Sequence, residues 1–180
     1  MTLENKLLVG SILPLFFYAA WFIAAYKFVN IRDWPKYYKT ILFFNLASAI
    51  YSLIFLHTYP LWQYKNIFLG HTFLDLLNFI IGFPCATIIF LHYYPKKVYK
   101  QIIYILMFML IYTSVEFIFY RLNSIVYYNG WSIGWSAIHN LYQFPLLMLH
   151  QRNPIWAWLI SFVALAIIMY VFNYPIGSAL

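Results

Sequence analysis

The stretch IIYILMFMLIYTSVEFIFYRL, residues 102–122, decides the fold class of this chain. It is a nearly unbroken apolar run of about 20 residues, which as an α-helix crosses the roughly 30 Å hydrocarbon core of a bilayer. Its single acidic residue, Glu116, lies inside the run and not at an end. The stretch therefore predicts a membrane-spanning helix that carries an ionisable group.

Similar apolar runs lie on both sides of this stretch. Together they predict an all-α polytopic transmembrane bundle in one domain, residues 1–180, with six spans. The other five predicted spans are residues 7–26, 41–59, 72–94, 132–149 and 155–172. Residues 132–149 are the most polar of them, and if they lie in the membrane interface the count is five. Pro14 is a candidate kink in the first span.

The composition agrees with a lipid environment. Of the 180 residues, 65% are hydrophobic and 8% charged, and the mean hydropathy is +0.76. So few charges do not cover a water-exposed surface. The net charge of +7 comes from basic residues between apolar runs, without a nucleic-acid-binding motif, so no nucleic-acid partner is expected. A single cysteine, Cys85, excludes an intramolecular disulfide.

Lysine and arginine gather in alternate loops. Loops one, three and five contain Lys27, Arg32, Lys36, Lys39, Lys96, Lys97, Lys100 and Arg152, and the opposite side has Lys6, Lys65 and Arg121. Because cytoplasmic loops carry the excess of Lys and Arg, loops 27–40 and 95–101 are predicted to be cytoplasmic and both termini outside. Within the first loop, Asp33 before Pro35 predicts a short interfacial helix capped by Asp33.

Ionisable side chains from three spans are expected at one depth. Asp75, Glu116 and His139 lie a few residues from the same predicted outer edge, roughly 5–10 Å deep at 1.5 Å per residue. A charge at the bilayer centre costs about 2.5–3.5 kcal/mol on insertion scales, so such groups face the bundle interior. The depths therefore predict an outward-facing polar pocket.

The candidate ligand-binding residues share this layer or adjoin it. They are His71, Asp75, Asn78, Tyr112, Glu116, His139, Asn140 and Gln143. The alternative is that Asp75, Glu116, His139 and Asn140 hydrogen-bond to one another and hold the helices together. His71 and Asp75, one turn apart, have the spacing of two metal ligands, but no motif completes a site, so no metal or cofactor is predicted.

The weakest span has a polar stripe. Ser132, Ser136, His139 and Gln143 are spaced four, three and four residues apart, which places them on one helical face. A helix with one such stripe spans a membrane when the stripe faces the bundle interior.

The flanks of the spans give further expectations. Asn129-Gly130 before residues 132–149 predicts a turn, with Trp131 as an interface anchor; the alternative is a lid over the pocket. The histidines near span ends, His57, His92 and His150, are expected in the interface.

Short motifs in a fixed order also resemble a family. They are Pro60-Leu61-Trp62, His71-Thr72 with Asp75, Phe83-Pro84, Tyr94-Pro95, Tyr112 with Glu116, Asn129-Gly130-Trp131, Phe144-Pro145 with His150, and Pro154 with Ala157-Trp158. From about Trp34 to Ser161 the chain resembles an uncharacterised family of small multi-pass membrane proteins from endospore-forming Gram-positive bacteria. The resemblance implies a helical bundle in a bacterial cell membrane. It carries over no catalytic residue.

Three functional hypotheses follow from the polar layer. The first is a binding or transport-type protein whose pocket accepts a small or lipophilic molecule or a cation. The second is an accessory or assembly subunit, in which the polar layer joins helices. The third is a membrane-embedded enzyme that acts on a lipid or isoprenoid-like substrate. The expected partners are membrane lipids and either further copies of the chain or another membrane protein.

Overall fold

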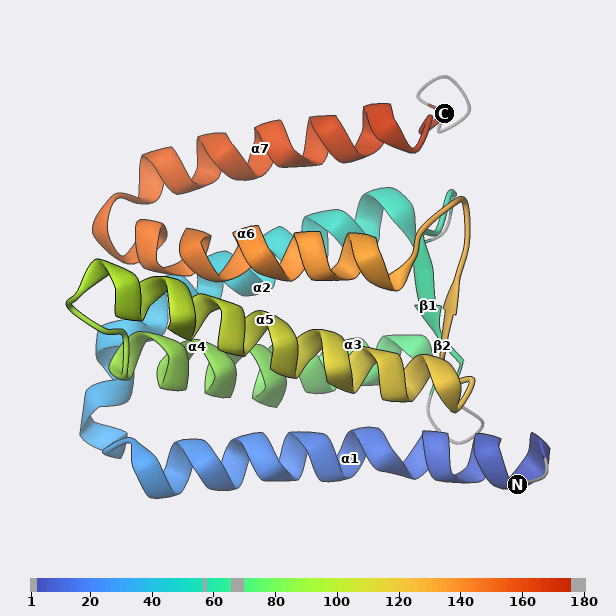
Figure 1. Ribbon diagram of the computed structural model, residues 1–180, viewed down its shortest axis with the longest axis horizontal. Helices are drawn as coiled ribbons and strands as arrows, with labels where there is room; N and C mark the ends of the chain where they lie inside the picture. Colours follow the sequence, from blue (N-terminus) through green and yellow to red (C-terminus); the bar gives the residue numbers. More distant parts are fainter. Residues whose placement is uncertain (1–2, 57, 66–69, 176–180) are drawn as a thin grey trace.

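The fold is an all-α bundle, as the apolar runs predict. The computed structural model describes residues 3–56, 58–65 and 70–175. In this part of the chain six helical rods lie lengthwise beside one another (Figure 1). They are α1 (Leu3–Phe28), α2 (Tyr38–Phe55), the continuous rod α3–η2–α4 (His71–Leu77, Asn78–Gly82 and Phe83–His92), α5 (Val98–Arg121), α6 (Ile133–Arg152) and α7 (Pro154–Val171).

Five segments of the described chain are long and apolar enough to cross a membrane. They are Leu8–Phe28, Ile31–Phe55, His71–His92, Val98–Arg121 and Pro154–Val171. By length and composition they indicate a multi-pass membrane protein. The helix α6 has the length but not the hydropathy, because its polar stripe falls within it. It nevertheless lies between α5 and α7 and packs against both (Figure 1).

The predicted spans and the observed helices differ at their ends. The helix α1 runs through Pro14 without interruption, so the expected kink does not break it. The second span, predicted to reach residue 59, ends at Phe55. The other helix ends differ from the predicted span ends by four residues or fewer. Capping contacts and the path of the loops, and not hydropathy alone, determine where a helix ends.

The rods alternate in direction and so give the bundle two distinct ends. At one end α1 begins, α7 ends and a small antiparallel sheet lies across the helices (Figure 1). Its strands, β1 (Trp62–Tyr64) and β2 (Ile125–Tyr127), pair with Trp62 opposite Tyr127. We call this the sheet end. The opposite end, which carries the loops near residues 29–37, 93–97 and 153, is the basic end.

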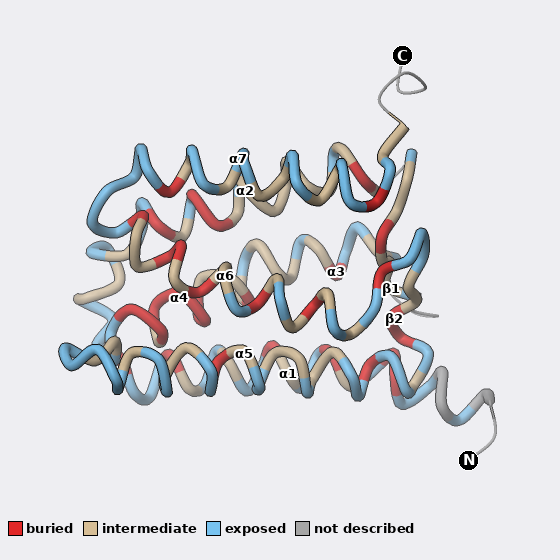
Figure 2. The backbone as a smooth tube through the Cα atoms, turned by 45° about the horizontal axis from the view of Figure 1, so that its top comes forward, coloured by how far each residue is buried: buried red, intermediate tan, exposed pale blue. Residues whose placement is uncertain are grey.

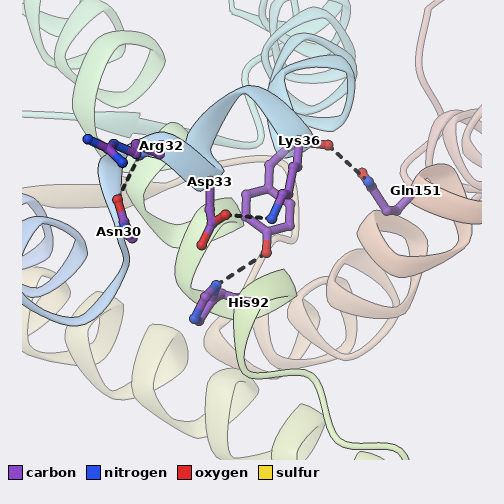
Figure 3. A network of polar contacts seen from close by, with 7 residues as sticks. Asn30, Arg32, Asp33, Lys36, His92 and Gln151 are labelled. Carbon is purple, nitrogen blue, oxygen red and sulfur yellow. Dashed lines mark hydrogen bonds and ion pairs between the residues drawn. The ribbon is translucent and has the colours of Figure 1, made fainter.

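A 3₁₀ helix, η1 (Ile31–Tyr37), leads into α2 at the basic end (Figure 3). Its cap is Asn30, whose side chain accepts a hydrogen bond from the Arg32 backbone N–H at 3.0 Å. Asp33, the predicted cap, instead lies inside the first turn and pairs with Lys36 at 2.5 Å. The prediction of Asp33 was wrong because the helix begins three residues earlier than the proline position suggests.

His150, which was expected in the interface, is buried against other side chains at the basic end. Gln151 Nε2 donates to the Lys36 carbonyl at 3.0 Å, so its Oε1 accepts the Thr40 hydroxyl proton at 2.7 Å. Thr40 Oγ1 therefore accepts from His150 Nδ1, 3.0 Å away, and the imidazole stacks on Phe43 at 4.2 Å. This series of hydrogen bonds fixes η1 and α2 to the end of α6. His92 is exposed, and His57 lies outside the described residues.

The core is aromatic and lies along the middle of the bundle. Buried residues concentrate on α4 and on the inner side of α6, whereas α7 is exposed along much of its length (Figure 2). The rings of Phe90, Phe108 and Phe144 pack with centroids 5.0–5.1 Å apart. The exposed sides of the outer helices are apolar, which is the surface that lipid contacts.

The third rod contains a π-helical turn next to Pro84. In this turn the Phe83 N–H bonds to the carbonyl of Asn78, five residues back. Proline has no N–H, so the next carbonyl, that of Phe79, lacks its backbone donor. Asn45 of α2 supplies one, with Nδ2 3.0 Å from the Phe79 oxygen. The π turn therefore depends on a side chain of another helix.

We expect Asn45→Ala to destabilise the protein by about 1 kcal/mol, because it leaves the Phe79 carbonyl unpaired. Pro84→Ala returns a backbone N–H, so the same substitution should cost less in that background. Chemical unfolding of the four proteins of this double-mutant cycle measures the difference. An equal cost in both backgrounds would show that Asn45 acts elsewhere.

Candidate functional site

A cavity of about 260 Å³ lies between the helices, with its polar side chains in the half nearer the sheet end. Seven of the eight residues predicted from sequence line it: Asp75, Asn78, Tyr112, Glu116, His139, Asn140 and Gln143. The eighth, His71, does not line the cavity but contacts Asp75 through its imidazole. The shared depth has a simple origin, since antiparallel helices with a 1.5 Å rise per residue place positions at similar distances from one end side by side.

Glu116 is held by two hydroxyl groups. Ser136 of α6 and Tyr127 of β2, the latter at 2.8 Å, both donate to its Oε1. Ser136 in turn accepts from the indole N–H of Trp131 at 2.9 Å. Burial and the neighbouring Glu116 raise the pKa of Tyr127, so this hydroxyl keeps its proton and donates. Within the described residues, the second oxygen, Oε2, receives no hydrogen bond and is left for the cavity.

Asp75 is positioned from the opposite wall. The backbone N–H of Tyr64 donates to His71 Nδ1 at 3.0 Å, which leaves the proton of a neutral His71 on Nε2. That nitrogen lies 3.2 Å from Asp75 Oδ2. One helical turn deeper, Asn78 donates to the Tyr64 hydroxyl at 3.2 Å. Burial raises the pKa of Tyr64 to about 12, so its hydroxyl is protonated at neutral pH.

His139 and Gln143 are further polar residues of the cavity. Both line the cavity from α6, and within the described chain neither forms a hydrogen bond. Asn140, beside them, donates to Thr113 at 3.3 Å. The partners of Asp75, Glu116 and Asn140 are therefore hydroxyl groups and His71, and the described contacts include none of the mutual bonds that the alternative reading requires.

The other half of the cavity is apolar. Phe43 and Phe44 of α2, Phe83 of α4, Leu147 of α6 and Trp158 of α7 line it toward the basic end. No lysine or arginine is among the described lining residues. The cavity thus combines an apolar aromatic half with a polar half whose described lining includes two carboxyl groups, an imidazole and no basic side chain.

Large apolar side chains cover the cavity at the sheet end. Leu61, Trp131 and Phe172 form a buried cluster there together with Phe55. Trp131 is buried and not the interface anchor that its sequence position suggested. The predicted turn before it is confirmed: Asn129 and Gly130 both have positive φ, and the Trp131 N–H bonds to the Tyr128 carbonyl at 2.9 Å.

Sequence reasoning missed several tyrosines of the site. Tyr18, Tyr51 and Tyr64 line the cavity, and Tyr127 reaches Glu116 from β2. Strands of three residues carry too short a pattern to be predicted, so the sheet that positions Tyr64 and Tyr127 had no signal. Tyr51 has a usable signal, since it follows Phe44 and Ser48 at helical spacing.

The side chains that could bind a metal ion are dispersed in the described part of the chain. Among the described residues, no three His, Cys, Asp or Glu side chains gather closely enough to hold an ion. The pair His71–Asp75 stands without a third ligand there.

Comparison with known proteins finds no family profile, curated protein or solved structure that matches this chain. The resemblance to membrane proteins of spore-forming bacteria therefore stays a prediction, and the function must be argued from the cavity itself.

Proposed function

We propose that this protein binds an amphiphilic small molecule with an amine head group inside the membrane. The observation that carries the proposal is the unequal division of the cavity: one half has Asp75 and Glu116 without a lysine or arginine, and the other half is aromatic. A molecule with a positive head and an apolar body is complementary to both halves.

The polar half favours a cation for energetic reasons. A buried carboxylate is costly unless a partner of opposite charge or several hydrogen bonds compensate it. Glu116 receives its hydroxyl donors on Oε1 alone, and His139 and Gln143 offer further polar atoms nearby. An ammonium group has three donors and no acceptor, so carboxylate and amide oxygens suit it. A phosphate or sulfate head would meet like charge.

The membrane orientation is part of the proposal. The basic end carries Lys36, Lys96, Lys97 and Arg152 near its loops, whereas Lys65 and Arg121 lie at the sheet end, next to β1 and at the end of α5. The excess of positive charge supports a cytoplasmic basic end and an outer sheet end, with both termini outside. A bacterial cell membrane is what the family resemblance implies.

The test is the head-group preference of the purified protein. Dodecylamine, dodecanol and dodecyl phosphate share one chain length and differ in head group. We expect dodecylamine to raise the melting temperature with increasing concentration, dodecanol to do so weakly and dodecyl phosphate not at all. Because the chains match, the contribution of the apolar half is the same for all three compounds, and the difference at equal micelle-bound concentration reports the polar half.

An equal response to all three compounds would contradict an amine site. Loss of the dodecylamine response when a fixed protein partner is co-purified would instead favour the accessory-subunit hypothesis. Asp33→Asn is a suitable control, because it removes one carboxylate at the basic end that is not among the residues lining the cavity. Its response to dodecylamine should equal that of the unmodified protein.

A further inference from the structure

The cavity has a side edge between α2 and α7. Near the basic end the two helices meet through Phe43 and Trp158, whose rings are edge to face at 4.8 Å. Near the sheet end Tyr174, just past α7, donates to the Ile54 carbonyl at 2.9 Å. Between these two closures, no hydrogen bond or ring contact joins α2 to α7 along their described lengths.

Residues of this intermediate stretch line the cavity from both helices. They are Ala47, Ser48 and Ile50 on α2, and Ser161, Phe162 and Leu165 on α7. We call this stretch, where residues of both helices line the cavity, the lateral window. Phe162 lines the cavity and is also 52% exposed, so its ring stands at the boundary between cavity and surroundings.

The lateral window opens at the depth of the hydrocarbon core. It lies midway along α2 and α7, both of which are apolar enough to span a bilayer. The neighbouring outward side chains are apolar too, with Leu46 53% and Leu159 50% exposed. Water and salts have little access at this depth, whereas acyl chains are abundant.

We infer that the ligand is a long-chain amine of the membrane itself, which enters sideways through the lateral window and leaves its chain lying between α2 and α7. This inference rests on the proposed function, because the head must reach the carboxylates. The geometry points to this route, since the sheet end is covered by the buried cluster of Leu61, Trp131, Phe172 and Phe55.

One apolar chain is the occupant that the window fits. Three of its bordering residues are small, namely Ala47, Ser48 and Ser161. The Ser161 hydroxyl donates a hydrogen bond to the Ala157 carbonyl at 2.8 Å. A helix that satisfies its own hydroxyl in this way presents no unpaired polar group to a passing chain. An aromatic or apolar border follows on either side, so apart from the Ser48 hydroxyl a methylene chain contacts apolar atoms.

The test uses a photoreactive dodecylamine that carries a diazirine near the end of its chain, added to protein in phosphatidylcholine vesicles. After irradiation, mass spectrometry maps the modified residues. We expect labels at residues 47–51 and 161–168, with labelling reduced at least fivefold by excess unmodified dodecylamine. Labels at residues 58–65 or 123–131 would overturn the inference, because the chain would then leave through the sheet end.

Two variants separate the inference from the proposed function. Ala47→Trp fills the window and should lower, at least fivefold, the labelling that excess unmodified dodecylamine displaces. Leu46→Trp, on the outward side of the same helix, should leave that labelling unchanged. Normal labelling in Ala47→Trp would overturn the lateral route alone. Labelling that is not reduced by unmodified dodecylamine, or is unchanged in Glu116→Gln, would overturn the amine site as well.

Discussion

Replacing Glu116 by glutamine should weaken dodecylamine binding about ten- to a hundredfold while the protein stays folded. A hydrogen bond to a charged group contributes about 1.5–3 kcal/mol, and 1.4 kcal/mol corresponds to a factor of ten. Glutamine keeps a carbonyl oxygen where Glu116 Oε1 accepts from Ser136 and Tyr127. It removes the negative charge that faces the ammonium group. Isothermal titration in one detergent measures the two affinities.

Glu116→Leu separates the binding role from the structural role. Leucine leaves the Ser136 and Tyr127 hydroxyls without their common acceptor, so a loss of stability of about 2 kcal/mol or more is expected. Glu116→Gln should melt within a few degrees of the unmodified protein. If glutamine destabilises as much as leucine and leaves binding intact, Glu116 is a structural residue and the amine site loses its central contact.

The gathering of Asp75, Glu116 and His139 was predictable from the sequence. Apolar length fixes where each helix starts, and short connections make neighbours antiparallel, so depth along the chain becomes position in space. Seven predicted residues therefore line one cavity without any knowledge of how the helices pack. The same reasoning predicts the all-α bundle but leaves the order of helices around the cavity open.

The partners of those residues were not predictable. Glu116 accepts a hydrogen bond from Tyr127, which lies on a three-residue strand. Its neighbour Ser136 accepts a hydrogen bond from the indole N–H of Trp131, which follows a turn with positive φ. Such contacts depend on loop paths, which hydrophobic periodicity does not encode. Trp131 and His150 were placed in the interface for the same reason: their sequence positions are terminal, and only packing shows that both are buried.

The cavity also gives the low hydropathy of α6 a physical meaning. In isolation a helix with Ser136, His139, Asn140 and Gln143 is a poor span. In the bundle α5 and α7 flank it, and its polar stripe faces the cavity and not lipid. A polar helix among apolar neighbours is thus consistent with a site for a polar head group, and the neighbours carry the hydrophobic contact with the membrane.

Gly10→Ala is the substitution in α1 for which we expect the largest loss of stability, about 1–2 kcal/mol net. Helix propensity alone predicts the opposite sign, a gain of roughly 1 kcal/mol from replacing an interior glycine by alanine. However, a Cβ at Gly10 would lie 2.0 Å from Ser124 Oγ and 3.0 Å from the Leu122 carbonyl oxygen. The loop after α5 must then move, and overpacking of this kind costs about 1–3 kcal/mol.

Two further variants test this reading of Gly10. Ser124→Ala removes the nearer obstacle, a hydroxyl that is buried without a hydrogen-bond partner in the described chain, and should restore part of the loss. Gly134→Ala is the matched control, because a Cβ there meets only Ser132 Oγ at 3.7 Å, an ordinary contact. Chemical unfolding in mixed micelles gives all the differences. A stabilised Gly10→Ala would mean that α1 does not pack closely on the loop before β2, and the bundle would then be looser at the sheet end than the buried Ser124 indicates.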